Sequence, residues 1–434
     1  MAAPEDFSNP FWTPALSEPP QEGPEEATRK QYASMPPIYR IAMDIGGLGT
    51  ISARSNTMTL LEFIVNPKSP GNQPTLKLTI TPSSCVLQMR DKYSENFKDV
   101  PNVVYPKQPP AACLNILSKK DPTVYWISVD RSNKRFRYGQ HLTNFSLTYL
   151  DVGLDGDKPF PDWMDTLTST DVFQDGDSVP TGDLAYDPLP VTMDKPPLVV
   201  TDQEISLEDL ENYTRTTFAN LPPGCQTLYH NVAGHNITLE SPDFPDLGDA
   251  IDASCKDQKL VCGDLLKKKA DANEFGDKLE TYLRITIGNN LGNSPGIPYV
   301  MEIWPPGHSS PIHDHGKASA VIKVLYGSIQ CSWYDAVQDH REPIQVGHPV
   351  ILKKGDVTWL GQKQYQIHKL ENPGKTVCVT LQCYQFEQSD KVHYEYFDYL
   401  DPDNNKKPFT PSSDMAYGKL VAQLRAEWKG NMPE

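Results

Sequence analysis

Proline recurs along this chain and limits the length of any regular element. The 434 residues include 40 prolines, and many of them separate short runs of apolar residues. Because proline lacks a backbone N–H and fixes its φ angle, it interrupts helices and central strands but fits turns and extended linkers. The sequence therefore predicts short strands joined by turns, in a chain long enough for two or three domains.

The N-terminal part predicts a disordered tail followed by a β-sandwich. Residues 1–30 combine proline and glutamate with few branched apolar residues, a composition typical of disorder. Over residues 31–155, branched and aromatic residues gather in short runs separated by turn signals. Strands are expected at Thr59–Val65, Leu76–Ile80, Cys85–Met89, Val124–Val129, Arg135–Tyr138 and Phe145–Leu150. An all-β sandwich is the natural way to bury strands of this kind.

Trp126 and the segment Phe136-Arg-Tyr-Gly139 resemble a β-sandwich module found in farnesoic acid methyltransferase-like proteins. No residue of this region marks a catalytic group. We therefore expect an accessory module for packing or recognition, whose ligand the sequence does not identify. The alternative is that this module recognises a glycan or a protein and that the rest of the chain is secondary.

The remainder of the chain predicts a linker and a second domain. Prolines interrupt acidic and small residues over residues 156–201, a composition typical of a linker. Residues 202–434 begin with helical signals and continue with strand patterns. The expected elements are a helix capped by Ser206-Leu-Glu-Asp209, a helical stretch over Asp249–Leu279, strands from Tyr282 to about Phe397 and a final helix over Met415–Trp428.

Charge and composition exclude several classes of protein. The net charge of -16 argues against a nucleic-acid-binding protein, because phosphates require basic patches. No run approaches the ~18 apolar residues of a membrane span, and the N-terminus lacks the basic start and apolar run of a signal peptide. The eight cysteines include no CxxC pair, so we expect reduced thiols in a cytoplasmic protein.

The segment Trp304-Pro-Pro-Gly-His-Ser-Ser-Pro-Ile-His313-Asp-His315 carries the strongest chemical signal. Two histidines at positions i and i+2 of a strand lie on the same side, because strand side chains alternate with period two. A third histidine, His368, follows the turn at Gly355-Asp356. Neutral imidazoles suit iron, copper, nickel or zinc. We therefore predict a metal site formed by His313, His315 and His368, and treat His308 as a residue that braces the loop.

The spacing of these histidines and of nearby glycines resembles the two sequence blocks of the cupin superfamily, a jelly-roll-type β-barrel. The resemblance implies a mainly β protein, with the N-terminal β-sandwich joined to a C-terminal cupin domain that carries a few flanking helices. The first cupin block usually has a glutamate where this chain has Ala320, so the ligands would be three histidines. Three neutral ligands leave the full charge of a divalent metal, which favours an anionic ligand such as a thiolate.

The histidine block and the preceding Tyr282-Leu-Arg284 also resemble the cysteine dioxygenase family, over roughly Tyr282 to Asp401. The resemblance implies that Arg284 binds the substrate carboxylate, a role suited to its planar fork of donors. It implies that Tyr282 lines the substrate pocket.

The series Thr380-Leu-Gln-Cys-Tyr384 stands where the cysteine dioxygenase family has Ser-x-His-x-Tyr. The resemblance gives Tyr384 a catalytic role, as a donor to sulfur or oxygen. Gln382 replaces the family's histidine, and an amide orients a hydroxyl but does not shuttle protons. Ala320 occupies the position of the cysteine that animal members cross-link to the tyrosine, so no cross-link is expected. Cys383 should point away from the side of Tyr384.

The function that these resemblances imply is an Fe(2+)-dependent thiol dioxygenase of cysteine catabolism. It would convert L-cysteine and O2 to cysteine sulfinate, incorporating both oxygen atoms. One alternative is a dioxygenase for another small thiol, such as 3-mercaptopropionate or cysteamine. A second alternative is a non-catalytic metal-binding cupin scaffold.

Overall fold

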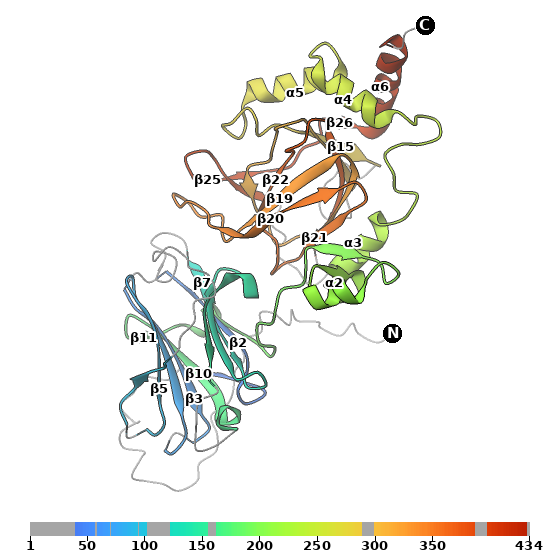
Figure 1. Ribbon diagram of the computed structural model, residues 1–434. Coiled ribbons are helices and arrows are strands. Elements are labelled where there is room, and N and C mark those ends of the chain that lie inside the picture. The colour runs from blue at the N-terminus through green and yellow to red at the C-terminus, as the bar shows by residue number, and fades with distance from the viewer. Residues whose placement is uncertain are drawn as a thin grey trace, which may run out of the picture. The chain divides into compact units, whose positions relative to one another are not determined.

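The computed structural model describes residues 40–56, 59–69, 71–93, 95–101, 122–154, 162–288, 299–386 and 397–431. The protein is mainly β and divides into two compact units, Met1–Met193 and Asp194–Glu434 (Figure 1). The tail expected over residues 1–30 lies outside the described residues. No helix among the described residues has both the length and the apolar character needed to cross a membrane.

The N-terminal unit contains two antiparallel sheets. One has the strand order β1-β10-β3-β4-β5-β6 with β11 on β10, and the other has the order β12-β2-β7-β8-β9. The strands are β1 (Arg40–Ala42), β2 (Leu48–Ser55), β3 (Leu61–Pro67), β4 (Thr75–Ile80), β5 (Cys85–Arg90), β6 (Lys98–Asp99), β7 (Thr123–Asp130), β8 (Arg135–Gln140), β9 (Thr148–Gly153), β10 (Leu167–Gln174), β11 (Asp177–Ser178) and β12 (Leu184–Asp187).

The expected β-sandwich is confirmed by the burial pattern of these strands. Leu61, Phe63 and Val65 of β3 are buried while the residues between them are half-buried, as expected for a strand with one face on the core. Trp126 of β7 is fully buried and pairs in register with Gly139 of β8. A Cβ atom at Gly139 would collide with the indole ring, which explains why glycine follows the aromatic residues of that segment.

The prediction of a linker over residues 156–201 is wrong. Strand β10 lies inside this range and pairs with both β1 and β3, and β12 pairs with β2. The last strand of the range, β13 (Leu198–Val200), belongs to the C-terminal unit. The prolines of this range that the structure describes lie between these short strands, where no ladder hydrogen bond is needed from them. The frequency of proline alone therefore did not distinguish turns from a linker.

The described residues of the C-terminal unit form one eight-stranded and one six-stranded sheet, which make up the cupin barrel. Their strand orders are β14-β13-β21-β18-β23-β16-β15-β26 and β20-β19-β22-β17-β24-β25. The further strands are β14 (Arg215–Thr217), β15 (Leu283–Ile287), β16 (Tyr299–Trp304), β17 (Ile312–His313), β18 (Ser319–Tyr326), β19 (Ser328–Tyr334), β20 (Gln345–Lys353), β21 (Val357–Leu360), β22 (His368–Glu371), β23 (Cys378–Gln385), β24 (Phe397–Leu400), β25 (Lys406–Phe409) and β26 (Met415–Ala416).

Helices flank this barrel, and Figure 1 shows α4, α5 and α6 together beside β15 and β26. Their bounds are α2 (Leu207–Asn212), α3 (Pro223–Val232), α4 (Leu247–Lys256), α5 (Val261–Ala272) and α6 (Tyr417–Asn431). The capping box at Ser206 is confirmed, with reciprocal bonds to Asp209. The helical stretch expected over Asp249–Leu279 is two helices, and the second one ends at Ala272.

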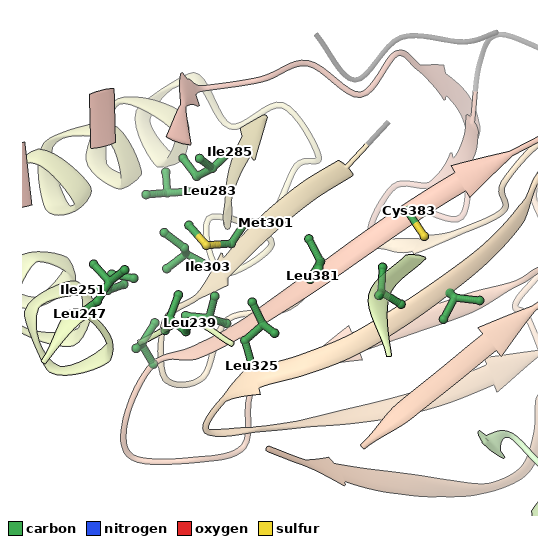
Figure 2. Close-up of a cluster of buried hydrophobic side chains, with 14 of the residues drawn as sticks. Leu239, Leu247, Ile251, Leu283, Ile285, Met301, Ile303, Leu325, Leu381 and Cys383 are labelled. Atoms are coloured by element: carbon green, nitrogen blue, oxygen red, sulfur yellow. The ribbon is translucent and has the colours of Figure 1, made fainter. Parts of the chain in front are cut away.

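The larger cupin sheet is covered on both faces, and strand alternation decides which residues face which side. Leu283, Met301 and Leu381 join the apolar cluster shared with the helices, as Figure 2 shows. Their neighbours Arg284 and Glu302 have the opposite orientation and are also buried. Because side chains alternate along each strand, one face of this sheet packs on helices and the other faces the barrel interior.

Candidate metal centre and substrate pocket

Three buried histidines converge inside the cupin barrel. His313 ends β17 and pairs in register with His368 at the start of β22, while His315 follows two residues later. One ligand atom from each lies within 4.8 Å of the others. The ring centroid of His313 is 4.8 Å from that of His315 and 4.9 Å from that of His368. The structure thus brings together the three residues predicted from the sequence.

Backbone carbonyls fix the orientation of two of these rings. His313 Nδ1 lies 3.0 Å from the Pro311 carbonyl oxygen, and His315 Nδ1 lies 2.9 Å from that of Gln366. A carbonyl accepts only an N–H, so each Nδ1 carries the hydrogen and each Nε2 keeps its lone pair. His315 Nε2 is buried without a hydrogen-bond partner in the described structure. A buried, unpaired nitrogen beside two further imidazoles fits a metal ion.

Burial keeps all three imidazoles neutral. Desolvation lowers the pKa of His313 to about 4 and lowers the pKa of His315 and His368 well below the usual histidine range. Neighbouring histidines lower the pKa of His315 and His368 further. Metal ligation requires the neutral imidazole, so no proton has to leave the site near pH 7 before a metal binds.

We expect the metal-free protein to lose stability as the pH falls below 6.5. His313 binds a proton below pH 6.5 when unfolded but only below about pH 4 when folded, so acid favours the unfolded state. At pH 5 this residue alone should lower the free energy of unfolding by about 2 kcal/mol relative to pH 7. Urea unfolding at the two pH values should therefore show a larger loss in the wild type than in His313→Phe. An equal loss in both proteins would contradict this expectation.

A buried ion pair lies on the adjoining strands of the same barrel. Arg284 on β15 pairs in register with Glu302 on β16, and Arg284 Nη1 is 2.9 Å from Glu302 Oε1. Both side chains are less than a tenth exposed. Burial raises the pKa of the Glu302 carboxyl to about 7, and the nearby Arg284 charge limits that rise.

The ion pair continues into a chain of hydrogen bonds that ends at a tyrosine. The amide nitrogen of Gln382 donates to Glu302 Oε2, and the Tyr384 hydroxyl donates to Gln382 Oε1. The guanidinium carbon of Arg284 lies 5.6 Å from the centre of the Tyr384 ring. These contacts connect Arg284, Glu302, Gln382 and Tyr384, and we call the four residues the polar ring.

Tyr384 connects the polar ring to the histidines. Its ring is stacked on that of His315, with centroids 6.0 Å apart. Ala320 lies directly opposite Tyr384 on β18, so the neighbouring strand offers a methyl group and no thiol there. Cys383 belongs to the apolar cluster drawn in Figure 2, whereas Tyr384 belongs to a separate cluster with Ala320, which confirms that Cys383 points away from Tyr384.

Residues 265–393 match the family model described as cysteine dioxygenase type I. The C-terminal unit contains a cysteine dioxygenase-type cupin domain. The match spans the histidine triad and all four residues of the polar ring. This family binds a metal through a histidine triad, and the corresponding group in this domain is His313, His315 and His368.

Solved structures with cupin folds are also similar to part of this chain. Oxalate oxidase bound to the substrate analogue glycolate is 15% identical over 25% of this chain, with a TM-score of 0.19, and the chain spans only 53% of its length. The Cnp3 cupin domain of Schizosaccharomyces pombe is 12% identical over 25% of this chain and 64% of its own, with a TM-score of 0.19. A cupin superfamily protein of Desulfitobacterium hafniense is 15% identical over 24% of this chain and 78% of its own length, with a TM-score of 0.19. The assignment depends on the family match and not on these structures.

The other predicted residues of the dioxygenase-type domain lie near the barrel interior. Tyr282 is buried and stacked on Trp304, with ring centroids 4.2 Å apart, within an apolar cluster that also holds barrel residues. His308 stands outside the triad, and its Nδ1 lies 2.7 Å from the Thr281 carbonyl oxygen. This contact joins the loop before the triad to the segment before β15, as expected for a bracing residue.

Sequence reasoning missed Glu302. The signal was present, because Glu302 is the single charged residue of the otherwise apolar and aromatic strand Tyr-Val-Met-Glu-Ile-Trp304. All its neighbours on β16 are buried or half-buried. A carboxylate in such a strand requires a partner, since a buried unpaired charge is costly. The predicted Arg284 is that partner.

Proposed function

We propose that the cupin domain is an iron(II)-dependent dioxygenase that oxidises a small thiol, with L-cysteine as substrate and cysteine sulfinate as product. The observation that carries this proposal is the triad of neutral, buried imidazoles set beside Arg284 and Tyr384 in a cysteine dioxygenase-type domain. In the net reaction both oxygen atoms of O2 add to the thiolate sulfur, which is oxidised to a sulfinate. Cysteine catabolism is the corresponding biological role.

The bound Fe(2+) would supply the means of activating O2 and of holding sulfur close to it. The three imidazoles hold the metal without adding negative charge, because burial keeps them neutral. A site with this charge favours binding of the thiolate over the neutral thiol.

Arg284 would orient the substrate by its carboxylate. Its guanidinium has five N–H donors, and its Nη1 is engaged with Glu302. The planar fork of donors suits a carboxylate. Arg284 is held on a barrel strand by its pairing with β16, and that rigid position would fix the direction of the bound thiol.

Tyr384 would hold a proton close to the reacting sulfur and oxygen. Burial raises the pKa of its hydroxyl far above neutral pH, so the group stays protonated. Its hydrogen bond to Gln382 sets the direction of the hydroxyl, and its stacking on His315 places the ring beside the triad. Tyr282, stacked on Trp304, would complete the apolar wall of the pocket.

A thiol panel with an oxygen electrode tests this function. We expect the iron-loaded protein to consume one O2 for each cysteine and to form cysteine sulfinate, identified by mass spectrometry. The panel should include 3-mercaptopropionate and cysteamine, the other thiols that fit a three-histidine cupin. Oxygen uptake with one of these thiols and none with cysteine would show that this thiol, and not cysteine, is the substrate. The absence of uptake with every thiol, at full iron content, would favour a metal-binding scaffold.

We propose that the N-terminal β-sandwich is an accessory module. Among the described residues, the group that could hold a metal ion lies in the C-terminal unit. The catalytic proposal therefore rests on the C-terminal unit by itself.

A further inference from the structure

We propose that Glu302 determines thiol specificity in the cupin domain by neutralising Arg284, so that cysteine binds little better than the carboxylate-free aminothiol cysteamine. This inference rests on the proposed function, because it concerns the thiol that the same site takes. Arg284 by itself suggests strong selection for a carboxylate. Its buried partner changes that expectation.

The contact between the two side chains is close and largely enclosed by protein. Arg284 Nη1 lies 2.9 Å from Glu302 Oε1, and the two residues are register partners on adjacent strands. The relative exposures of their side chains are 8% and 4%. Water therefore screens neither charge, and a carboxylate that reaches Arg284 must also come close to Glu302.

The charges of the ion pair have opposite effects on an incoming carboxylate. The guanidinium attracts it and offers hydrogen-bond donors, while the Glu302 carboxylate, whose Oε1 lies 2.9 Å from Arg284 Nη1, repels it. The Glu302 carboxyl, with a pKa of about 7, is ionised at pH 8. Like charges about 6 Å apart in a protein interior weaken binding by about tenfold or more, which is comparable with the gain from the arginine.

Glu302 also acts on Tyr384 through the polar ring. This second effect is the same for every thiol. Its second oxygen, Oε2, accepts from the Gln382 amide nitrogen. An ionised carboxylate accepts and never donates, so Gln382 must turn its amide oxygen toward Tyr384. That oxygen is the acceptor of the Tyr384 hydroxyl. Changing Glu302 therefore also disturbs Tyr384, and a comparison of two thiols in the same variant cancels this common effect.

Calorimetric titration under nitrogen tests the proposal without turnover. Cysteine and cysteamine share a thiol and an amine and differ by the carboxylate. Each is titrated at pH 8 into iron-loaded wild type, Glu302→Gln and Glu302→Leu. We expect the two Kd values to lie within about tenfold of each other in the wild type. In both variants the binding of cysteine should strengthen relative to that of cysteamine, so that the ratio of the two Kd values changes by about tenfold or more.

Two features keep the result interpretable. Glu280→Gln is the matched control, because Glu280 is a largely buried carboxylate of the same unit that pairs with Lys369 at 3.4 Å, outside the polar ring. It should leave the Kd ratio unchanged. Leucine serves as the second variant should glutamine disturb folding, and the wild-type ratio is decisive without any variant.

A wild-type preference for cysteine above about a hundredfold would overturn the proposal. An unchanged ratio in a folded, iron-containing Glu302 variant would also overturn it. Because binding is measured without oxygen, a protein that binds both thiols and oxidises neither would refute the dioxygenase function while leaving the role of Glu302 intact.

Discussion

The His368→Ala variant is expected to fold and to retain less than about a tenth of the wild-type iron. His368 is one of the three proposed ligands, and it begins β22, whereas His313 ends β17 and His315 follows two residues later. Two imidazoles two residues apart then remain, which is too few for a stable site that must also leave positions open for substrate. Oxygen uptake with cysteine should disappear together with the metal. Elemental analysis of the purified protein measures the first effect.

The matched control for this variant is His340→Ala. His340 is mostly exposed and its Nε2 lies 3.3 Å from Asp339, and it takes no part in the triad. This variant should keep its iron and its oxygen uptake. Full iron content in His368→Ala would refute the assignment of the third ligand. It would also refute the proposed three-histidine metal site.

The second large effect is expected from Arg284→Met, which removes the charge and keeps most of the side-chain volume. The value of kcat/KM for cysteine should fall about tenfold, mainly through KM, because the hydrogen bonds of the guanidinium to the substrate carboxylate are lost. The value for cysteamine, which has no carboxylate, should change by less than about threefold. Steady-state oxygen uptake with both thiols measures the difference.

The fold should tolerate the loss of Arg284, because Glu302 can take up a proton. Its carboxyl already has a pKa of about 7, and removal of Arg284 raises that pKa further. A suitable control is Arg341→Met, which breaks another buried pair of the same unit, with Asp335. It is expected to lower stability without changing the ratio of the two thiols. An equal fall for cysteine and cysteamine in Arg284→Met would refute the carboxylate clamp.

Much of the metal site was predictable because its information is local. The i, i+2 spacing of His313 and His315 places both on one side of an extended segment, whatever the rest of the chain does. The same alternation placed Cys383 and Tyr384 on opposite faces of β23, as the structure confirms. The match of residues 265–393 to the cysteine dioxygenase model confirms the family that the same motifs indicated.

The linker was predicted wrongly because proline frequency is a local signal and strand pairing is not. Strand β10 becomes a central strand of the N-terminal sandwich only through its partners β1 and β3, of which the first lies more than a hundred residues earlier in the chain. Nothing within residues 156–201 specifies those partners. The boundary between the units likewise lies at Met193 and Asp194, beyond most of the predicted linker.

The sequence by itself determined the kinds of residue in the site, the face of the strand that each one occupies and the class of metal ligand. Only the tertiary structure decided their partners. The register between β15 and β16 sets Arg284 against Glu302, and the pairing of β17 with β22 sets His313 against His368. The physical reason is that alternation follows from the geometry of a single strand, while register depends on which distant strands bury their apolar faces together.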